Sequence, residues 1–317
     1  MDHKITRLRK LAYPVLFIGV LAASTASLFI RFAQQEAPSI VIAAVRLTLA
    51  TLLVFPFAIP KLKEEIKCLK GNEIGLIILA GVFLAIHFAS WITSLEHTTV
   101  ASSIVLVSTT PLWVAMFSGV LLGEKLNKWT WVGLVLTLLG GVIVAGSAEC
   151  QLSASGFTFP NVGKLFTGTN AWGNLLALVG AWMVAGYLMV GRRLRPRLSL
   201  QSYVFMVYGS AALLLLTLAG IEGHSLLGYS KEIYLWLLLL AVIPQSIGHT
   251  SLNWALAYVP AAFVSVALLG EPVGTIILSS IFLRETPTIL ELMGGALILI
   301  GIYTASRMDH QADPQEG

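Results

Sequence analysis

The sequence predicts an all-α integral membrane protein with ten transmembrane helices, and three observations predict it. Of the 317 residues, 56% are apolar or aromatic. Only 11% are charged, where an ordinary soluble domain carries about 25%. The apolar residues gather in ten stretches that suit the roughly 20 residues a helix needs to cross the bilayer, and they lack the short alternating strands of an outer-membrane barrel.

Hydropathy places the ten spans along the chain, separated by loops rich in charged and turn-forming residues. The first span follows the basic segment 1–10 and lacks a small-residue cleavage site, so we expect it to be retained as a helix. Aromatic residues near several span ends, among them Trp129 and Trp172, suit the headgroup layer. The predicted spans are 13–32, 39–59, 74–94, 100–122, 129–146, 172–190, 201–220, 234–254, 260–283 and 289–306.

Lysine and arginine residues are distributed unequally between the two sides of these spans. Fifteen of the twenty lie on the side of the N-terminus, four lie on the opposite side, and Arg46 lies within the second span. Because positive charge concentrates in cytoplasmic loops, both termini are predicted to be cytoplasmic. We expect a multi-pass protein of the plasma membrane, the inner membrane in a bacterium, whose basic runs 61–70 and 192–197 contact membrane lipid. No nucleic acid is then needed to explain the basic residues.

The two halves of the chain are similar to each other at a single offset of 161 residues. The offset predicts a first repeat at 11–147, an extracytoplasmic linker at 148–171, a second repeat at 172–306 and a cytoplasmic tail at 307–317. Isolated matches of Leu and Ala mean little in so apolar a chain, but an ordered series of Pro, Ser, Leu and Glu followed by two glycines would rarely arise by chance. The informative pairs are Pro111 with Pro272, Ser118 with Ser279, Leu122 with Leu283, Glu124 with Glu285, Gly133 with Gly294 and Gly140 with Gly301.

Each predicted repeat contains five spans, and this odd number determines how the copies are oriented. The second copy must enter the membrane from the opposite side, so the repeats are related by an axis in the membrane plane. Inverted repeats of this kind are typical of secondary transporters, because two interchangeable packings supply inward-open and outward-open states. Some channels and scaffolding membrane proteins are also duplicated, and that alternative stays open.

The later part of each repeat carries a recognisable pattern. It reads PLWVAMFSGVLLGEKL at 111–126 and EPVGTIILSSIFLRET at 271–286, and the second span reads AVRLTLATLLV at 44–54. Together with the count of five plus five spans, these motifs resemble the EamA repeat of the drug/metabolite transporter superfamily over nearly the whole chain. The resemblance implies ten helices in an inverted arrangement. It also implies export or exchange of small metabolites, often amino acids or their derivatives, in the plasma membrane.

Two charged residues within spans are the first candidates for substrate binding or proton coupling. Glu271 is expected near the middle of the ninth span and directly precedes Pro272, which frees a backbone carbonyl one turn earlier. Arg46 lies in the second span, where a lone guanidinium needs a partner. The alternative is a permanent structural pair between the two residues. The sequence does not decide whether they touch.

Further candidates are polar and aromatic residues within spans. His87 and His249 nearly correspond in the repeat and could relay protons, although a buried imidazole is more often simply hydrogen-bonded. They do not form a metal motif, and neither a metal nor another cofactor is predicted. A polar strip could line a cavity for an amphipathic metabolite, or its members could bond their own helices. The strip includes Ser90, Trp91, Thr110, Gln245, Asn253 and Trp254.

A last group of residues is interpreted as structural. The prolines Pro111 and Pro272 lie within the fourth and ninth spans, where they suit helices that rock. Glu124 and Glu285 are expected to cap the N-termini of the fifth and tenth spans. The glycines of those spans are expected to allow close helix packing. They include Gly133 and Gly294.

These observations favour a secondary transporter that exports or exchanges a small organic metabolite, an amino acid or related compound being favoured, by alternating access. Protons are a candidate coupling ion, and the oligomeric state is not predicted. A non-coupled facilitator or channel is the alternative, and a membrane sensor or enzyme is a weaker one. The sequence contains no nucleophile–base motif, glycine-rich phosphate loop or sizeable soluble domain, so we do not expect an enzyme.

Overall fold

The computed structural model describes residues 2–98, 103, 106–123, 128–147, 152–153, 156–157, 168–282 and 289–306, which are almost entirely helical. Within these residues, six helical stretches are long and apolar enough to cross a membrane. They are Thr6–Ala33, Ser39–Cys68, Gly71–His97, Ala171–Leu194, Leu200–Ile221 and Lys231–Ala255. Four shorter apolar helices accompany them, namely Thr110–Leu122, Lys128–Ile143, Ala261–Thr275 and Leu292–Ala305.

The helices follow one another along the chain with a single pair of two-residue strands between them. The first half contains α1 (Asp2–Ala23), α2 (Ala26–Ala33), α3 (Ser39–Cys68), α4 (Gly71–His97), α6 (Thr110–Leu122) and α7 (Lys128–Ser147). Strands β1 (Leu152–Ser153) and β2 (Gly156–Phe157) pair antiparallel. The second half contains α8 (Gly168–Leu194), α9 (Leu200–Ile221), α10 (Lys231–Leu240), the π-helix η2 (Ala241–His249), α11 (Thr250–Ala255), α12 (Ala261–Leu268), α13 (Glu271–Phe282) and α14 (Ile289–Ser306).

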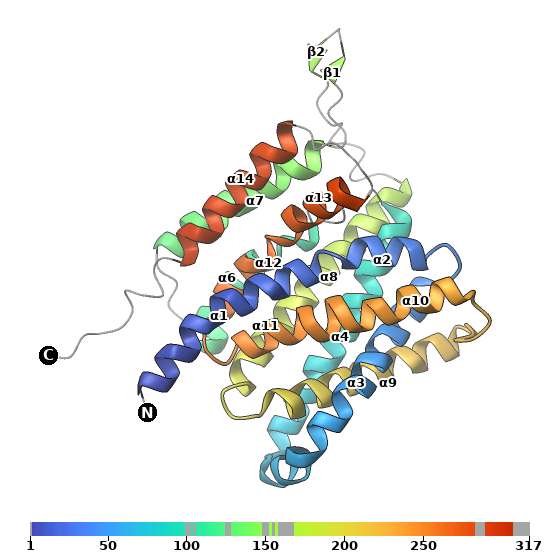
Figure 1. Cartoon of the computed structure of the whole chain (residues 1–317), viewed down its shortest axis with the longest axis vertical. Helices are drawn as coiled ribbons and strands as arrows, with labels where there is room; N and C mark the ends of the chain where they lie inside the picture. The colour runs from blue at the N-terminus through green and yellow to red at the C-terminus, as the bar shows by residue number, and fades with distance from the viewer. Residues whose placement is uncertain are drawn as a thin grey trace, which may run out of the picture.

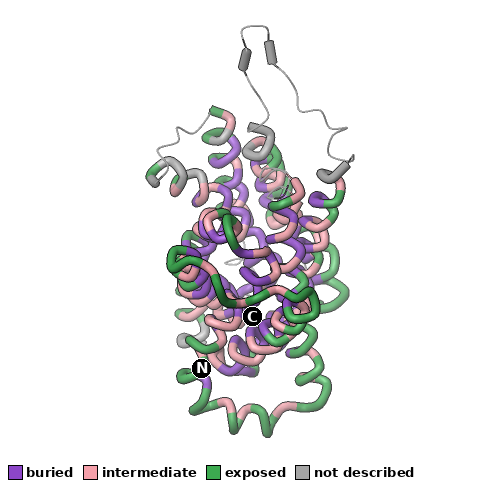
Figure 2. The backbone as a smooth tube through the Cα atoms, turned by 90° about the vertical axis from the view of Figure 1, so that its right-hand side faces the viewer, coloured by how far each residue is buried: buried purple, intermediate pink, exposed green. Residues whose placement is uncertain are grey.

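Helices from the two halves pack side by side (Figure 1). The pair α7 and α14 runs together at one edge of the bundle, α3 packs on α9, and α4 packs on α8. Helix α1 lies along η2 and α11, while α2 contacts α10. Buried residues concentrate where these helices face one another, and exposed residues follow the outer surfaces (Figure 2). The bundle is therefore built mainly from contacts between the halves.

Glycines explain why α7 and α14 approach so closely. A Cβ atom built on Gly133 would lie 2.5 Å from the carbonyl oxygen of Gly301, and one built on Gly140 would lie 2.6 Å from that of Gly294. Small residues let helix backbones approach in this way, which maximises van der Waals contact in an apolar environment. A larger side chain at either position would push the helices apart.

Within the described residues, four predicted spans are interrupted, which hydropathy did not reveal; one of them, the fourth, has a turn at 108–109 just before α6. The first is broken between α1 and α2 at Ser24 and Thr25, and the eighth contains the π-helix η2 around Pro244. The ninth is broken at 269–270, so Glu271, near the middle of the predicted span, is the first residue of α13. Pro272 occupies the second position of α13, where its missing N–H has no helical partner to lose. No charged residue lies at Ser24, Thr25, Pro244, Leu269 or Gly270, so the mean hydropathy of these spans does not mark the breaks.

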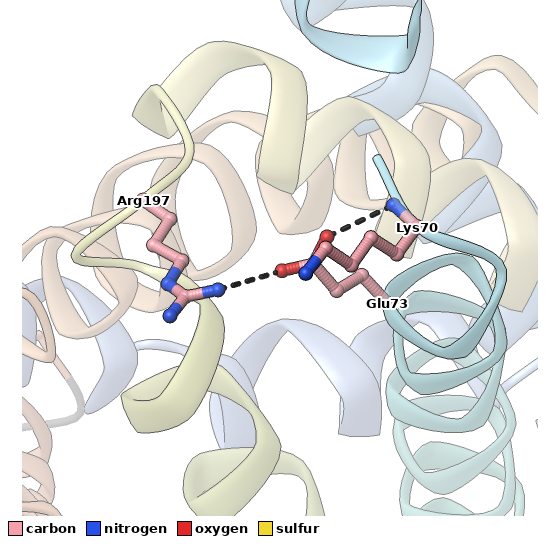
Figure 3. Close-up of polar contacts among 3 residues, drawn as sticks. All are labelled: Lys70, Glu73 and Arg197. Atoms are coloured by element: carbon pink, nitrogen blue, oxygen red, sulfur yellow. Dashed lines mark hydrogen bonds and ion pairs between the residues drawn. The ribbon is translucent and has the colours of Figure 1, made fainter. Parts of the chain in front are cut away.

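The end of α3, the start of α4 and the turn between α8 and α9 are joined by carboxylate contacts. Glu73 accepts a hydrogen bond from the backbone N–H of Lys70 at 3.0 Å and forms an ion pair with Arg197 at 3.1 Å (Figure 3). Glu65 accepts a 3.0 Å hydrogen bond from the hydroxyl of Ser199, whose side chain also caps α9. These contacts link the two halves at one end of the bundle.

Candidate functional site

A cavity lies where the interrupted helices meet. Its wall is formed by the α1–α2 break, the α12–α13 break, the start of α6 and the end of η2, with α3, α4 and α8 completing it. It contains about 730 Å³ of space not filled by protein atoms, part of it open to the outside. Eight residues singled out from the sequence line it: Arg46, His87, Trp91, Thr110, Pro111, His249, Glu271 and Pro272.

Arg46 is the largest fully buried side chain of the described residues and is 1% exposed. Its Nε donates a hydrogen bond of 2.8 Å to Oε1 of Gln245, in η2. Its guanidinium carbon lies 4.1 Å from the centroid of the Phe88 ring, a cation–π contact. Its Nη1 is buried and has no hydrogen-bond partner among the described residues. One edge and one face of the cation are thus held by neutral groups.

Glu271 lies on the same cavity but does not form an ion pair with Arg46. Within the described part of the chain, its carboxylate forms neither an ion pair nor a hydrogen bond. The start of α13 is fixed by Thr275, whose hydroxyl lies 3.0 Å from both the Ser24 and the Glu271 carbonyl oxygens. The break in α12–α13 is therefore anchored on the break in α1–α2, and the carboxylate remains available for a ligand or a proton.

His87 on α4 and His249 on η2 both lie beside the ring of Phe88. His87 Nδ1 lies 2.8 Å from the carbonyl oxygen of Gly180, so we assign the proton to Nδ1. Its ring stacks on Trp91 with centroids 5.9 Å apart. His249 meets the edge of Phe88 at 5.2 Å, and its Nδ1 has no partner among the described residues. Imidazole, indole and phenyl rings thus form one aromatic cluster beside Arg46.

Four residues of the predicted polar strip lie outside the cavity lining. Ser90 bonds the Ile86 carbonyl oxygen of its own helix at 2.7 Å. Gln245 is fully buried and reaches the site only through Arg46. Asn253 donates to the His249 carbonyl oxygen at 2.9 Å and to the hydroxyl of Tyr187. Trp254 lies on a second cavity. A helical residue faces the cavity only at a particular angle around its helix, which hydropathy alone does not give.

The prolines and glycines interpreted as structural from the sequence lie in two different parts of the bundle. Pro111 and Pro272 each occupy the second position of a new helix, α6 and α13, and both line the cavity. Gly133 lies on α7 and Gly294 on α14, both at the contact between these helices. Glu124 and Glu285, predicted to cap helices, lie outside the described residues.

Sequence reasoning missed Phe88, which packs behind the lining residues Arg46 and His249, and several residues of the cavity wall itself. Phe88 contacts both Arg46 and His249, and Thr275 fixes the start of α13. Ser27 and Ser265 also line the cavity. A phenylalanine in an apolar span carries no signal of its own, whereas Thr275 could have been found from its place one turn after Glu271. Among the described residues, no group of three His, Cys, Asp or Glu side chains could hold a metal ion.

The second cavity lies at the end of α3, beside the turn between α8 and α9. It contains about 1010 Å³ of space not filled by protein atoms, part of it open to the outside, and Lys61, Trp254 and Tyr258 contribute to its wall. Arg195 also lines it and donates from Nε to the Asn253 carbonyl oxygen at 2.9 Å. Burial lowers the pKa of the Arg195 guanidinium below its ordinary value. Because its bonds go to backbone carbonyls, Arg195 fixes the turn onto α11.

Comparison with known proteins places this helical bundle in a family. The model of the EamA-like transporter family matches residues 10–146 and again residues 171–307. The chain belongs to this family. It is therefore a transporter of the drug/metabolite transporter superfamily and a multi-pass membrane protein, which in bacteria lies in the inner membrane. Membership also identifies it as a transporter of a small molecule and not as an enzyme.

Curated relatives of this EamA-like transporter are distant but cover most of its length. The uncharacterized transporter YdfC of Bacillus subtilis is 24% identical over 82% of this chain and 79% of its own. An uncharacterized transporter of Archaeoglobus fulgidus is 25% identical over 92% of this chain and 95% of its own. The pseudopaline exporter CntI of Pseudomonas aeruginosa strain PAO1 is 23% identical over the same shares.

A solved crystal structure has the same fold as this EamA-like transporter. It superposes with a TM-score of 0.75 and 18% sequence identity, and the match covers 96% of this chain and 99% of that chain. Similarity at this level of identity concerns the fold alone. It supports the helical architecture and says nothing of the substrate.

Proposed function

We propose that this protein is a secondary transporter that exports or exchanges a small organic metabolite by alternating access. In this proposal, ten spans form two inverted repeats, at 11–147 and 172–306, and both termini are cytoplasmic. The linker at 148–171 is extracytoplasmic, and the tail at 307–317 is cytoplasmic. The single observation that carries the proposal is the cavity, because residues of both halves line it where helices from each half begin or are interrupted.

The positions of the helices support the inverted repeat. Helices α9, α13 and α14 begin 161 residues after α3, α6 and α7, respectively. The contacts are also matched: α4 packs on α8, and their counterparts η2 and α11 pack on α1. If each half adopted the conformation of the other, the contacts between α4 and α8 and the contacts of α1 with η2 and α11 would therefore be interchanged. That property is what alternating access between two equivalent packings requires.

The cavity suggests how transport is coupled. Glu271 carries the acidic side chain of the cavity, and no described residue neutralises it by an ion pair. A carboxylate in such a place is expensive when ionised, so its protonation state should respond to the substrate and to the conformation. We therefore assign proton coupling to Glu271. The histidines His87 and His249 are secondary candidates, since both line the cavity.

An amino acid or a related compound is the favoured substrate. The cavity combines a cation, a carboxylate and aromatic rings in one enclosure, which suits a small amphipathic molecule. The name of the pseudopaline exporter among the relatives favours the outward direction. Export and exchange both remain within the proposal because each uses the same cycle.

Flux through liposomes that contain the purified protein tests this function. A panel of labelled amino acids, nucleosides and sugars is measured with and without a pH gradient and with unlabelled substrate on the far side. We expect saturable flux that is accelerated by substrate on the far side, since a loaded carrier returns faster than an empty one. Flux without saturation or acceleration would instead indicate a facilitator or channel. Chemical turnover without flux would contradict transport altogether.

A further inference from the structure

Arg46 is a buried cation that lines the cavity together with Glu271, with which it forms no direct ion pair. Arg46 contacts the neutral amide of Gln245 and the neutral ring of Phe88, and it has no ion pair among the described residues. Transfer of an ionised group out of water costs several kcal/mol unless an opposite charge or hydrogen bonds replace the water. An anion bound beside the guanidinium would supply that compensation.

The contacts of Arg46 also fix which part of the guanidinium is free. The hydrogen bond to Gln245 uses Nε, and Phe88 covers one face of the group. Nη1 remains without a partner within the described residues although it is buried. Arginine presents its N–H groups in a rigid plane, so holding one edge and one face determines the direction of the remaining donors. The cation is therefore oriented before any ligand binds.

The side chain of Trp91 lines the same cavity and carries a second donor without a partner among the described residues. Trp91 is 6% exposed, and its indole Nε1 is buried without an acceptor among the described residues. An indole nitrogen can only donate a hydrogen bond. His87 stacks on this indole, and its own Nδ1 proton is already used by the Gly180 carbonyl oxygen. Two unused donors, one of them cationic, thus belong to side chains that line one enclosure.

These donors call for a ligand group that accepts hydrogen bonds and carries negative charge. Glu271 lies on the same cavity and would repel such a group, but the structure does not bring its carboxylate into an ion pair with Arg46. The wall of the cavity also contains apolar side chains, among them Val184 and Leu268, beside hydroxyl groups such as that of Ser265. A planar carboxylate on a small apolar or aromatic body matches both the donors and the wall.

We propose that Arg46 and Trp91 bind the carboxylate group of the transported molecule, and that Gln245 positions Arg46 for this contact. The inference rests on the proposed function, because it assigns a recognition site within the transport cavity. It makes a carboxylate an obligatory feature of the substrate. An α-amino group is optional, and a simple amine or amide is excluded.

Thermal unfolding of the purified full-length protein in detergent tests this assignment without measuring transport. The probes are L-phenylalanine, L-leucine, 3-phenylpropionate and 4-methylpentanoate, each compared with its own primary amide. The two members of a pair have nearly the same shape, and only the acid carries the negative charge. We expect the acids to raise the unfolding temperature saturably and the amides to leave it unchanged, because a ligand stabilises the state that binds it.

Variants then identify the residues that bind the carboxylate. Arg46→Lys keeps the charge but loses the planar donor geometry, so apparent affinity for the acids should fall about 10-fold to 100-fold. Arg31→Lys is the matched control, because Arg31 is exposed and does not line the cavity, and it should bind as the wild type does. Trp91→Phe keeps the ring and removes one donor, so it should bind about tenfold more weakly and provides the test if Arg46→Lys does not fold.

Three results would overturn the assignment. They are equal stabilisation by acids and amides, no stabilisation by any acid of the panel, and unchanged affinity in both Arg46→Lys and Trp91→Phe. Failure of the proposed function gives a different result. Acids that bind while no flux occurs would contradict transport alone, whereas saturable flux of amides or amines that acids do not inhibit would contradict the carboxylate site alone.

Discussion

Two adjacent glycines of α7 should respond in opposite ways to the same substitution. A Cβ atom on Gly140 would lie 2.6 Å from the carbonyl oxygen of Gly294 and 2.8 Å from Cγ1 of Ile298, whereas one on Gly141 would meet no atom within 4 Å. Ordinary van der Waals contact begins at 3.4 Å, so Gly140→Ala must move α7 and α14 apart by about 0.8 Å at this point. The carbonyl oxygen belongs to the backbone and cannot rotate away.

The expected magnitudes follow from these distances. Overfilling a packed contact by one methyl group costs about 1–3 kcal/mol. Gly141→Ala meets no obstacle and should gain about 0.5–1 kcal/mol, because alanine loses less backbone entropy than glycine in a helix. The two variants should therefore differ by about 1.5–4 kcal/mol in the free energy of unfolding, with opposite signs relative to the wild type.

The assay is the unfolding midpoint of each purified variant in the same detergent, followed by the intrinsic fluorescence of the tryptophans. Gly140→Ala should unfold at a lower midpoint than the wild type and Gly141→Ala at the same or a higher one. An unchanged or raised midpoint for Gly140→Ala would refute the close contact between α7 and α14. A loss of stability in Gly141→Ala as large as that in Gly140→Ala would show that any side chain on this helix is harmful.

Three further substitutions test other parts of the account. Glu271→Gln should abolish the dependence of flux on a pH gradient without changing the unfolding midpoint, and unchanged proton dependence would remove Glu271 from coupling. Arg46→Leu should reduce expression or transport more than Arg31→Leu, since only Arg46 is buried; equal effects on both measurements would argue against a special role. Gly81→Ala should lower the free energy of unfolding by about 1 kcal/mol or more, because its Cβ would lie 3.0 Å from the Val207 carbonyl oxygen, whereas Gly75→Ala on the same helix meets no atom within 4 Å.

Six of the ten predicted spans correspond to helices long and apolar enough to cross a membrane, because apolar length is a direct physical requirement of the bilayer. Helix α14 covers the predicted residues 289–306, and α3 begins at Ser39 as predicted. The interruptions were not predictable in the same way. Residues 269–270 end α12 without adding charge, so the mean hydropathy of the span hardly changes. Both α12 and α13 pack against α1, which is distant in the sequence.

The candidate site was predictable only in part. Arg46 and Glu271 were visible because charged residues in a span are rare and costly. The partner of Arg46 was not visible, because Gln245 is 199 residues away and belongs to a π-helix. Ser90 and Trp254 were predicted to line the cavity, but neither does. Hydropathy gives depth in the membrane, whereas lining a cavity also requires the rotation of each helix.

The most direct test of alternating access is the exposure of the cavity to each side of the membrane. Ser108 lines the cavity and is half-buried, so a single cysteine, Ser108→Cys, can report on it in a chain whose Cys68 and Cys150 are replaced by alanine. Oriented vesicles are treated with a small membrane-impermeant thiol reagent on one side at a time. A retained Cys68 and a Ser225→Cys variant serve as references, since both positions are exposed and are predicted to lie on opposite sides. We predict that Ser108→Cys reacts with the reagent from both sides of the membrane. If both references react as expected but Ser108→Cys reacts from one side only, alternating access is contradicted.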